Sequence, residues 1–256
     1  MNSEPTPVGG TSRDAFLGGA LMIEQPVTGY RAGLDAVLLA AACRAQAGER
    51  VLDAGAGVGV VGLCVARRVA GARVTLFERE PVLAALAEGN AVRNGLEGRV
   101  AVAVADLTQP LSRLGPMAAE VGQYQHVLAN PPYYADGRGT PATDPLKAGS
   151  HAMAAGSLDD WARFLAAMAA PDGRMMLIHR ADALDEILAV LERRFGGLVV
   201  RPIYPRVGEM ASRLLISGRK GSRAPLSIAP GLVLHDGAAY RPEIEAVLRH
   251  GAALPT

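Results

Sequence analysis

The sequence is poor in the features that would indicate a membrane protein, a disulfide-bonded protein or a metal centre. It contains only two cysteines, Cys43 and Cys64, both in apolar surroundings and without the spacing of a metal-binding motif. No apolar run approaches the ~20 residues that a membrane-spanning helix needs, and the first residues lack the apolar core of a signal peptide. We therefore expect two buried, reduced thiols, no bound metal and a cytoplasmic location.

The chain also has no strong excess of charge of either sign. Its 26 Lys and Arg residues nearly balance 25 Asp and Glu residues, so the formal net charge is +1. Such a balance gives no overall electrostatic attraction to nucleic acid, so any RNA-binding surface must be local. With 256 residues, half of them hydrophobic, the chain is long enough for one large α/β domain with a substantial core.

Strand-like and helix-like apolar segments alternate along most of the chain. We expect a disordered tail at residues 1–13 and a single domain over 14–256, with a hairpin and helix at 14–45 and a small appendage at 224–256. The expected strands are 51–53, 73–78, 99–104, 125–129, 174–179, 198–204 and 211–217, and the expected helices are 34–44, 58–69, 81–93, 161–170 and 181–195. Because no helix separates the last two strands, they should pair antiparallel in an otherwise parallel, doubly wound, seven-stranded sheet of the Rossmann-like α/β class.

A glycine-rich turn follows the first of these strands. Asp53 ends the strand, and Gly55, Gly57 and Gly59 lead into an apolar helix. Glycines allow a ligand to approach the backbone closely, and the start of a helix supplies free N–H groups. The spacing Gly57-x-Gly59-x-x-Gly62 also fits the dinucleotide-binding fingerprint. The turn indicates a nucleotide cofactor, although a tight turn that binds nothing remains the alternative.

Polar residues end each of the next strands. Glu78 lies about 20 residues beyond the glycine turn, at the spacing of a ribose-binding acid, and Asp106 follows the third apolar strand. Asn130 follows the fourth. Because ligands of open α/β sheets bind outside the carboxyl ends of the strands, these side chains and Asp53 predict one crevice.

The most informative stretch is Asn130-Pro131-Pro132-Tyr133, which we predict to be the catalytic site. The prolines fix the backbone, and Pro131 has no N–H to compete for acceptors. The side-chain oxygen of Asn130 and the carbonyl of Pro131 then offer two neighbouring acceptors beside the ring of Tyr133. Two such acceptors suit a planar –NH2 group, such as the amine of adenine or a carboxamide, although Asn-Pro also begins ordinary turns.

These motifs resemble those of the class I S-adenosylmethionine-dependent methyltransferases. The turn at 53–59 resembles their cofactor loop, and the tetrapeptide at 130–133 is similar to that of enzymes that methylate amino groups on planar systems. Gly18-Gly19, Gln25-Pro26, residues 29–31 and residues 35–40 resemble the N-terminal region of the bacterial tRNA1(Val) adenine-N6 methyltransferase family. The tail at 230–235 resembles related bacterial sequences, so the resemblance covers nearly the whole chain.

The resemblance implies S-adenosyl-L-methionine as the cofactor. The residues that it assigns to cofactor binding are Tyr30, Arg31, Asp35, Asp53, Gly55, Gly57, Gly59, Glu78 and Asp106. Glu78 would take the ribose hydroxyls, Asp106 would face the adenine amine, and Asp53 would orient the loop or bind the cofactor amino group. Arg31 could pair with the methionine carboxylate, or it could be an exposed surface charge or form a salt bridge with Asp35. Asn130 and Pro131 would accept hydrogen bonds from the substrate amine and stabilise its developing positive charge.

A local excess of positive charge predicts where RNA would bind. Between residues 201 and 223, six cationic side chains are accompanied by a single acidic residue, Glu209, which gives a local charge of +5. The six are Arg201, Arg206, Arg213, Arg219, Lys220 and Arg223. We interpret this basic patch as the surface for RNA, with tRNA as the expected partner, although runs of charge are often only solvated faces. The chain could act as a monomer or a homodimer.

The sequence leaves several functions open. Motifs similar to Asn130-Pro131-Pro132-Tyr133 also serve enzymes that methylate protein glutamine amides, guanine N2 or DNA adenine. A nicotinamide-dependent dehydrogenase could use the same glycine turn, but the antiparallel last strand pair argues against it. A non-catalytic RNA-binding module would not need both the turn and the tetrapeptide. We favour methylation of adenine N6 in tRNA.

Overall fold

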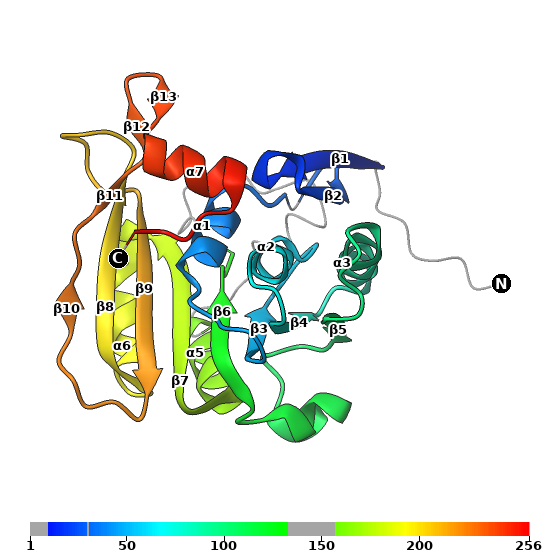
Figure 1. Cartoon of the computed structure of the whole chain (residues 1–256). Helices are drawn as coiled ribbons and strands as arrows, with labels where there is room; N and C mark the ends of the chain where they lie inside the picture. The colour runs from blue at the N-terminus through cyan, green and yellow to red at the C-terminus, as the bar shows by residue number, and fades with distance from the viewer. Residues whose placement is uncertain (1–9, 30, 133–156, 256) are drawn as a thin grey trace.

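The computed structural model describes residues 10–29, 31–132 and 157–255, which form a three-layer α/β arrangement (Figure 1). The strands of the central sheet and its helices are β3 (Arg50–Ala54), α2 (Val60–Arg68), β4 (Arg73–Glu78), α3 (Pro81–Arg93), β5 (Val100–Val104), β6 (Tyr124–Ala129), α5 (Ser157–Met168), β7 (Ala169–Arg180), α6 (Leu184–Leu191), β8 (Phe195–Tyr204) and β9 (Arg213–Lys220). Before them come β1 (Thr11–Phe16), β2 (Leu21–Pro26) and α1 (Leu34–Ala42), and after them β10 (Ser227–Ile228), β11 (Leu232–Val233), β12 (His235–Asp236), β13 (Ala239–Tyr240) and α7 (Pro242–His250).

The large sheet has the predicted doubly wound, mostly parallel topology. Its strand order is β10-β8-β9-β7-β6-β3-β4-β5, and β11 also pairs with β8. The pairs from β7 through β6, β3 and β4 to β5 are parallel, whereas β9 is antiparallel to both β7 and β8. The predicted antiparallel last strand pair is therefore confirmed.

The predicted strand count of seven is too low, because the sheet contains nine strands. All seven predicted strands are present, and the two additional strands, β10 and β11, have two residues each. They run parallel to β8 along the sheet edge. Two residues are too few for an alternating hydrophobic pattern, so sequence periodicity could not find them.

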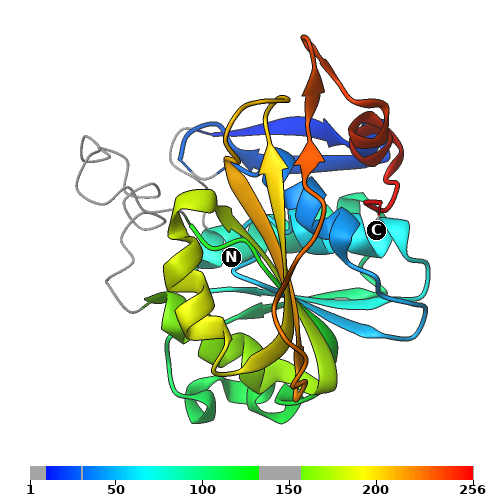
Figure 2. The same cartoon turned by 90° about the vertical axis from the view of Figure 1, so that its left-hand side faces the viewer.

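Two hydrophobic cores lie on opposite faces of the sheet because successive strand residues point to opposite sides. In β7, Met175 and Leu177 belong to one core, whereas Met176 and Ile178 belong to the other. The first core is covered by α5 and α6, and the second by α1, α2, α3 and α7 (Figure 2). Burial raises the pKa of the Cys43 thiol to about 11, as expected for a structural cysteine.

The N-terminal hairpin begins earlier than predicted. Strand β1 starts at Thr11, so residues 11–13, which we predicted to belong to a disordered tail, are part of the hairpin. The Thr11 hydroxyl donates a 2.6 Å hydrogen bond to Glu24 of β2. This cross-strand pairing orders a segment whose polar composition alone suggests disorder.

Two further boundaries differ from the prediction near the fifth strand. Helix α5 begins at Ser157 and ends at Met168, whereas we predicted a helix over 161–170. The Pro171-Asp172-Gly173 segment, which lies between the predicted helix at 161–170 and the predicted strand at 174–179, is part of the longer strand β7, which shifts register against β6 between Tyr124 and His126. The pairing with β6 stops after Ala169 and resumes at Arg174, so the segment that normally breaks a strand forms an irregularity within β7.

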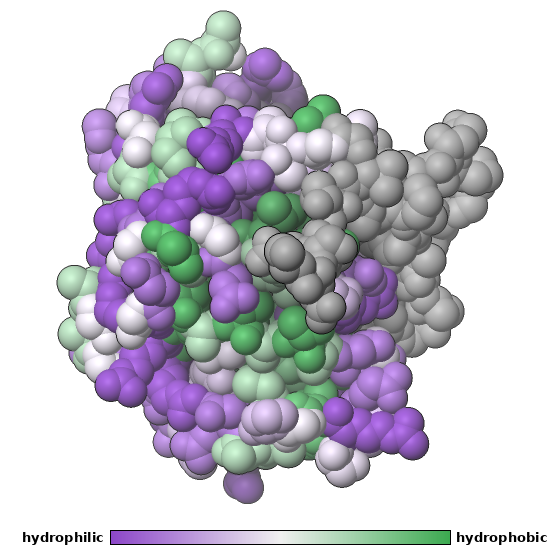
Figure 3. Space-filling model, turned by 90° about the vertical axis from the view of Figure 1, so that its right-hand side faces the viewer, coloured by the Kyte–Doolittle hydropathy of each residue, from purple (hydrophilic) through white to green (hydrophobic). Residues whose placement is uncertain are grey.

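The face at the β5 edge of the sheet shows apolar side chains in its middle and hydrophilic ones around them (Figure 3). Val92 of α3 and Val104 of β5 are more than half exposed. β5 has only five residues, and a short edge strand is a poor template for pairing with other chains.

Candidate functional site

The carboxyl ends of the parallel strands bring the predicted site residues to one edge of the sheet. Ala54 of β3 pairs with Phe77 of β4 on one side and with Ala129 of β6 on the other. The residues that follow these three positions are Gly55, Glu78 and Asn130. The glycine turn, the ribose-binding candidate and the start of the proline motif therefore emerge side by side, as predicted.

The buried side chain of Asp53 helps to hold the glycine turn in its conformation. Its side chain is 1% exposed, and its Oδ2 accepts a 2.9 Å hydrogen bond from the Gly62 N–H in helix α2. Burial raises the pKa of the Asp53 carboxyl to about 7, although the Gly62 N–H lowers it and the Glu78 charge raises it further. Of the two roles that we considered for Asp53, this geometry supports orientation of the loop.

Each glycine of the turn is required by its surroundings. Gly55, Gly57 and Gly59 have φ values of +63°, +57° and +89°, which other residues adopt only with strain. A Cβ on Gly55 would lie 2.2 Å from Cη2 of Trp161, and a Cβ on Gly59 would lie 2.7 Å from Cδ1 of Leu76. The glycines thus serve the close packing of the turn as well as access to its backbone.

The side chain of Glu78 also helps to hold the glycine turn in its conformation. Its carboxylate accepts hydrogen bonds from the N–H groups of Gly57 (2.7 Å), Arg79 (2.8 Å) and Glu80 (2.9 Å). Burial raises the pKa of Glu78, while these three backbone N–H groups act against that effect. A carboxylate has about four lone-pair sites, so it can accept one more hydrogen bond without rearrangement.

Asp106 has a less constrained environment at the same edge. Its Oδ1 accepts hydrogen bonds from the Thr108 N–H (2.9 Å) and from the Thr108 hydroxyl (2.8 Å). The side chain is half-buried, so it is accessible to a ligand. This local turn fixes one carboxylate oxygen and orients the other.

The proline motif begins where β6 ends. Ala129 is fully buried, Asn130 is half-buried, Pro131 is buried and Pro132 is half-buried. Tyr133, the fourth predicted catalytic residue, lies outside the described residues. Asn130 therefore stands at the boundary between the sheet and the surface, beside the glycine turn.

Of the N-terminal cofactor-binding candidates, Arg31 and Asp35 pair with different elements of the fold. Tyr30 lies outside the described residues. Arg31 forms a 2.9 Å ion pair with Asp14 in β1, and Asp35 forms a 2.9 Å ion pair with Arg213 in β9. The predicted alternative, an ion pair between Arg31 and Asp35, is therefore wrong, because each side chain has a partner that is distant in sequence.

The predicted basic patch is divided between two edges of the sheet. In the β7–β9 register, Arg213 lies opposite Arg180, at the edge that carries the glycine turn, whereas Arg219 lies opposite Arg174, toward the other edge. Arg201 and Arg206 lie toward the first edge, and Lys220 and Arg223 lie beside Arg219. Sequence proximity suggested one surface, but an extended strand separates its two ends.

Carboxylates from other parts of the chain reduce the local charge of this patch. Asp35 pairs with Arg213, and Asp172 pairs with Arg219 at 2.7 Å. The sequence interval itself contains only Glu209, which lies 3.5 Å from Arg206. The net charge of +5 counted over residues 201–223 is therefore not the charge of this surface in the folded protein.

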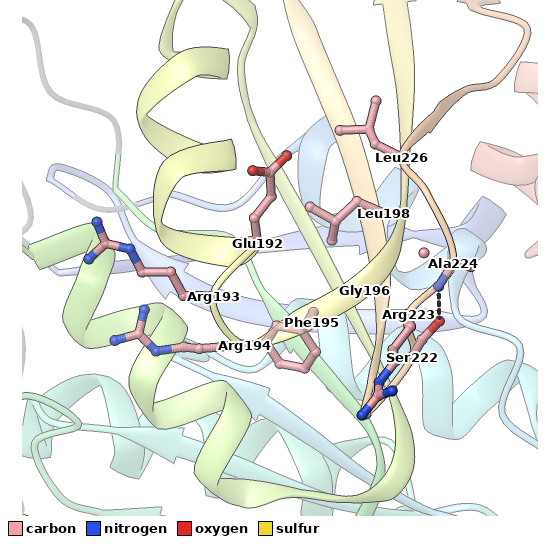
Figure 4. A pocket seen from close by; sticks show the side chains of 12 residues that line it. Glu192, Arg193, Arg194, Phe195, Gly196, Leu198, Ser222, Arg223, Ala224 and Leu226 are labelled. Atoms are coloured by element: carbon pink, nitrogen blue, oxygen red, sulfur yellow. Dashed lines mark hydrogen bonds between the residues drawn. The ribbon is translucent and has the colours of Figure 1, made fainter.

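A pocket of about 560 Å³ lies at the edge remote from the glycine turn, between the end of α6 and residues 221–226 (Figure 4). Its lining includes Arg193, Arg194 and Arg223. Arg194 is paired with Asp159 at 2.8 Å, and Figure 4 shows the Arg193 and Arg223 side chains extending in different directions. The guanidinium groups therefore do not converge on one ligand position.

Sequence reasoning misses two residues that contact the site. The apolar pattern around Trp161 indicates a core residue; it is 7% exposed, but its ring packs on Gly55. Nothing in the sequence singles out Asn90, which is fully buried and donates a hydrogen bond to the Val58 carbonyl in the glycine turn. A lone tryptophan or asparagine in a helical pattern carries no signal for such contacts.

Metal-binding clusters and membrane-spanning helices are both absent from the described residues. Among the described residues, no group of three or more His, Cys, Asp or Glu side chains could hold a metal ion. No helix in the described part of the chain is both long and apolar enough to cross a membrane.

Comparison with known proteins links this site to methyl transfer. Residues 32–151 match the family model described as "Methyltransferase small domain". A tRNA1(Val) (adenine(37)-N6)-methyltransferase of Shewanella amazonensis is 33% identical over 109 residues, which are 43% of this chain and 44% of that protein. The protein of the same name from Aeromonas hydrophila is 27% identical over 195 residues, which are 75% of this chain and 77% of that protein. This chain thus spans less than half of the Shewanella protein.

Solved structures extend the likeness over nearly the whole chain. The crystal structure of a predicted O-methyltransferase from Agrobacterium tumefaciens has a TM-score of 0.72 and 32% sequence identity, and it covers 86% of this chain and 97% of that one. A S-adenosylmethionine-dependent O-methyltransferase from Thermotoga maritima, with a TM-score of 0.52 and 19% identity, covers 77% of this chain and 68% of that one. The second likeness shows the shared fold alone.

Proposed function

Because the chain belongs to the class I S-adenosylmethionine-dependent methyltransferases, we propose that it methylates the exocyclic N6 amine of adenine in tRNA. The observation that carries this proposal is the position of Asn130-Pro131-Pro132 directly beside the glycine turn and Glu78. The names of the Shewanella and Aeromonas relatives support the same acceptor. The nicotinamide-dependent dehydrogenase that we considered has no support among these relatives.

The residues at this edge fit S-adenosyl-L-methionine, which supplies an activated methyl group when it is bound. We assign the backbone around Gly55, Gly57 and Gly59 to the amino-acid and ribose portions of the cofactor. Glu78 would accept a hydrogen bond from a ribose hydroxyl with its remaining lone pair, and Asp106 would accept one from the adenine amine. The glycines have no side chains of their own and take up positive φ values, so a ligand can come close to the backbone of the loop, as such binding requires.

Asn130 and Pro131 would act on the substrate. The Asn130 side-chain oxygen and the Pro131 carbonyl would accept the two hydrogens of an exocyclic amine. As positive charge grows on the nitrogen, both hydrogen bonds become stronger, so they stabilise the transition state more than the ground state. Because these acceptors are held at a strand end and by a proline backbone, little reorganisation is needed during the reaction.

RNA is the partner that we propose, with a revised surface. Of the six residues of the basic patch, Arg201, Arg206 and Arg213 lie near the catalytic edge, and among these Arg206 is the most exposed, with 53% of its side chain accessible. A tRNA that places an adenine at Asn130 would bring phosphates toward this edge first. Arg219, Lys220 and Arg223 would be reached only by a substrate that extends along β9.

Transfer of the methyl group to an oxygen is the competing function. It is suggested by the Agrobacterium relative, which carries the name of a predicted O-methyltransferase and is matched over nearly the full length of its own chain. A hydroxyl donates only one hydrogen bond and would leave one of the two acceptors without a partner. The paired acceptors therefore favour an amine. A protein glutamine amide or guanine N2 would use the same pair and differs only in its surroundings.

Nucleoside analysis separates these acceptors. Unmodified tRNA, rRNA and a mixture of small phenols would be incubated with the protein and isotope-labelled cofactor, and the products identified by mass spectrometry. We expect N6-methyladenosine in tRNA, and none with the Asn130→Ala variant. Label in a phenol or in protein, with none in tRNA, would refute the proposal.

A further inference from the structure

The outer edge of β2 is paired with two asparagine side chains, one in helix α3 and one at its C-cap, instead of with another strand. Asn90 accepts a 2.7 Å hydrogen bond from the Glu24 N–H with Oδ1 and donates a 2.9 Å bond to the Glu24 carbonyl with Nδ2. Asn94 makes the same pair of contacts with Met22, both at 2.9 Å. Each asparagine amide thus takes the place of a backbone amide in a neighbouring strand.

The spacing of the two elements makes this double pairing possible. Residues four apart in a helix are separated by about 6.0 Å along its axis, and residues two apart in a strand by about 6.7 Å. Asn90 and Asn94 therefore match Met22 and Glu24, whose backbone groups face the same way. The hairpin is attached to the methyltransferase fold at these two points.

The two asparagines differ in their third partner. Asn94 Nδ2 donates its other hydrogen to the Asn90 carbonyl within the same helix, at 2.8 Å. Asn90 Nδ2 donates its other hydrogen to the Val58 carbonyl, at 3.1 Å. Val58 is fully buried and precedes the N-cap of helix α2, so its carbonyl lies outside the hydrogen-bond ladder of that helix.

We propose that Asn90 is a positioning residue that couples the N-terminal hairpin to the cofactor loop. Its single amide group fixes the Glu24 backbone and the Val58 backbone together. Asn90 is fully buried, and Arg93 donates a further 2.7 Å hydrogen bond to its Oδ1, so the orientation of its amide is fully determined. If the hairpin moves, the hydrogen bonds of Asn90 therefore also move the backbone of Val58.

This inference rests on the proposed cofactor site at the glycine turn. The consequence is that cofactor binding and hairpin closure favour each other. Arg31 and Ala32, which follow β2, are tied to the hairpin by Asp14 and Gln25. A cofactor that stabilises the turn would therefore also stabilise the contacts that Arg31 and Ala32 make with the hairpin.

Asn94 provides the matched control for a binding experiment. The affinity for S-adenosylhomocysteine would be measured by calorimetry for the wild-type protein and for Asn90→Ala, Asn90→Asp, Asn94→Ala and Glu78→Gln. Asn90→Asp keeps an acceptor for the Glu24 N–H but cannot donate to the carbonyl of either Glu24 or Val58. We expect both Asn90 variants to lose at least about tenfold in affinity, and Asn94→Ala to lose less than about threefold. Equal losses for Asn90→Ala and Asn94→Ala would overturn the coupling.

The remaining outcomes are also decisive. If Glu78→Gln loses affinity but the Asn90 variants do not, the cofactor site stands and the coupling fails. If Glu78→Gln binds like the wild-type protein, the site assignment fails and the inference fails with it. If a variant does not fold, hydrogen exchange in the wild-type protein provides the test instead. S-adenosylhomocysteine should then slow the exchange of the Glu24 amide more than that of the Met22 amide. Equal changes at the two amides would contradict the proposal.

Discussion

Replacement of Gly55 by alanine tests how tightly the glycine turn is built. The new Cβ would lie 2.2 Å from Cη2 and 3.1 Å from Cζ3 of Trp161, so the indole or the turn must move by more than an ångström. Crowding of this kind costs about 1–3 kcal/mol in a packed core. The φ of +63° adds about 1–2 kcal/mol for any residue with a Cβ.

Gly95→Ala separates these two contributions. Gly95 has the same φ of +63°, but a Cβ there meets nothing within 4 Å. Its substitution should cost only the backbone term of about 1–2 kcal/mol. We therefore expect Gly55→Ala to destabilise the protein by about 1–3 kcal/mol more than Gly95→Ala, and to weaken S-adenosylhomocysteine binding, which Gly95→Ala should not do.

Urea denaturation of both variants measures the difference, and a double-mutant cycle identifies its cause. Trp161→Phe removes the atoms that the new methyl group would meet, so it should recover part of the stability lost in Gly55→Ala, with a coupling of about 1 kcal/mol or more. If the two glycine variants were equally stable, or if Trp161→Phe gave no recovery, the packing of the indole on the turn would not be the constraint we describe.

Three further predictions concern charge and catalysis. The pKa of Asp53 is about 7 in the folded protein against an ordinary 3.8, so its contribution to stability is complete below pH ~4 and is lost as the pH rises through about 7. As the pH rises from about 4 to about 7, the stability of Asp53→Asn should therefore gain progressively on that of the wild-type protein, by up to about 4 kcal/mol, and parallel pH profiles in denaturant unfolding would contradict this. Asn130→Ala should abolish methyl transfer and change the affinity for S-adenosylhomocysteine by less than a few-fold; wild-type turnover in a radiolabel assay would remove its catalytic role. Neutralising Arg201 and Arg206 together should weaken tRNA binding and reduce the slope of log K against log salt concentration by up to ~0.9 for each phosphate that these side chains neutralise in the wild-type complex, and an unchanged slope in filter binding would take this end of β8 out of the RNA surface.

The sequence was sufficient for the part of the fold that depends on local pattern. Strand β4 and helix α3 have the predicted bounds of 73–78 and 81–93, because each is a regular apolar pattern closed by a polar or breaking residue. The convergence of Glu78 and Asn130 on the glycine turn was also predictable, since parallel strands must end at one edge. These features follow from periodicity and topology.

Features that depend on tertiary partners could not be predicted. Nothing in the neighbourhood of Asp35 or Arg213 indicates that these two side chains pair, because they are separated by most of the chain. The order of residues 11–13 depends on pairing with β2, and the position of Trp161 against Gly55 depends on how α5 packs on the loop. Composition and spacing describe neighbours along the chain and omit those that folding supplies.

The asparagine pairing at β2 also affects how this surface meets other protein molecules. An exposed strand edge can recruit a strand from another chain, and this is a common route to aggregation. Here the outward N–H and C=O groups of Met22 and Glu24 are already occupied by the side chains of Asn90 and Asn94. The second amide hydrogen of each asparagine is bonded inside the fold, to the Val58 or the Asn90 carbonyl, so these side chains do not extend a ladder and this edge of the hairpin is closed to foreign strands.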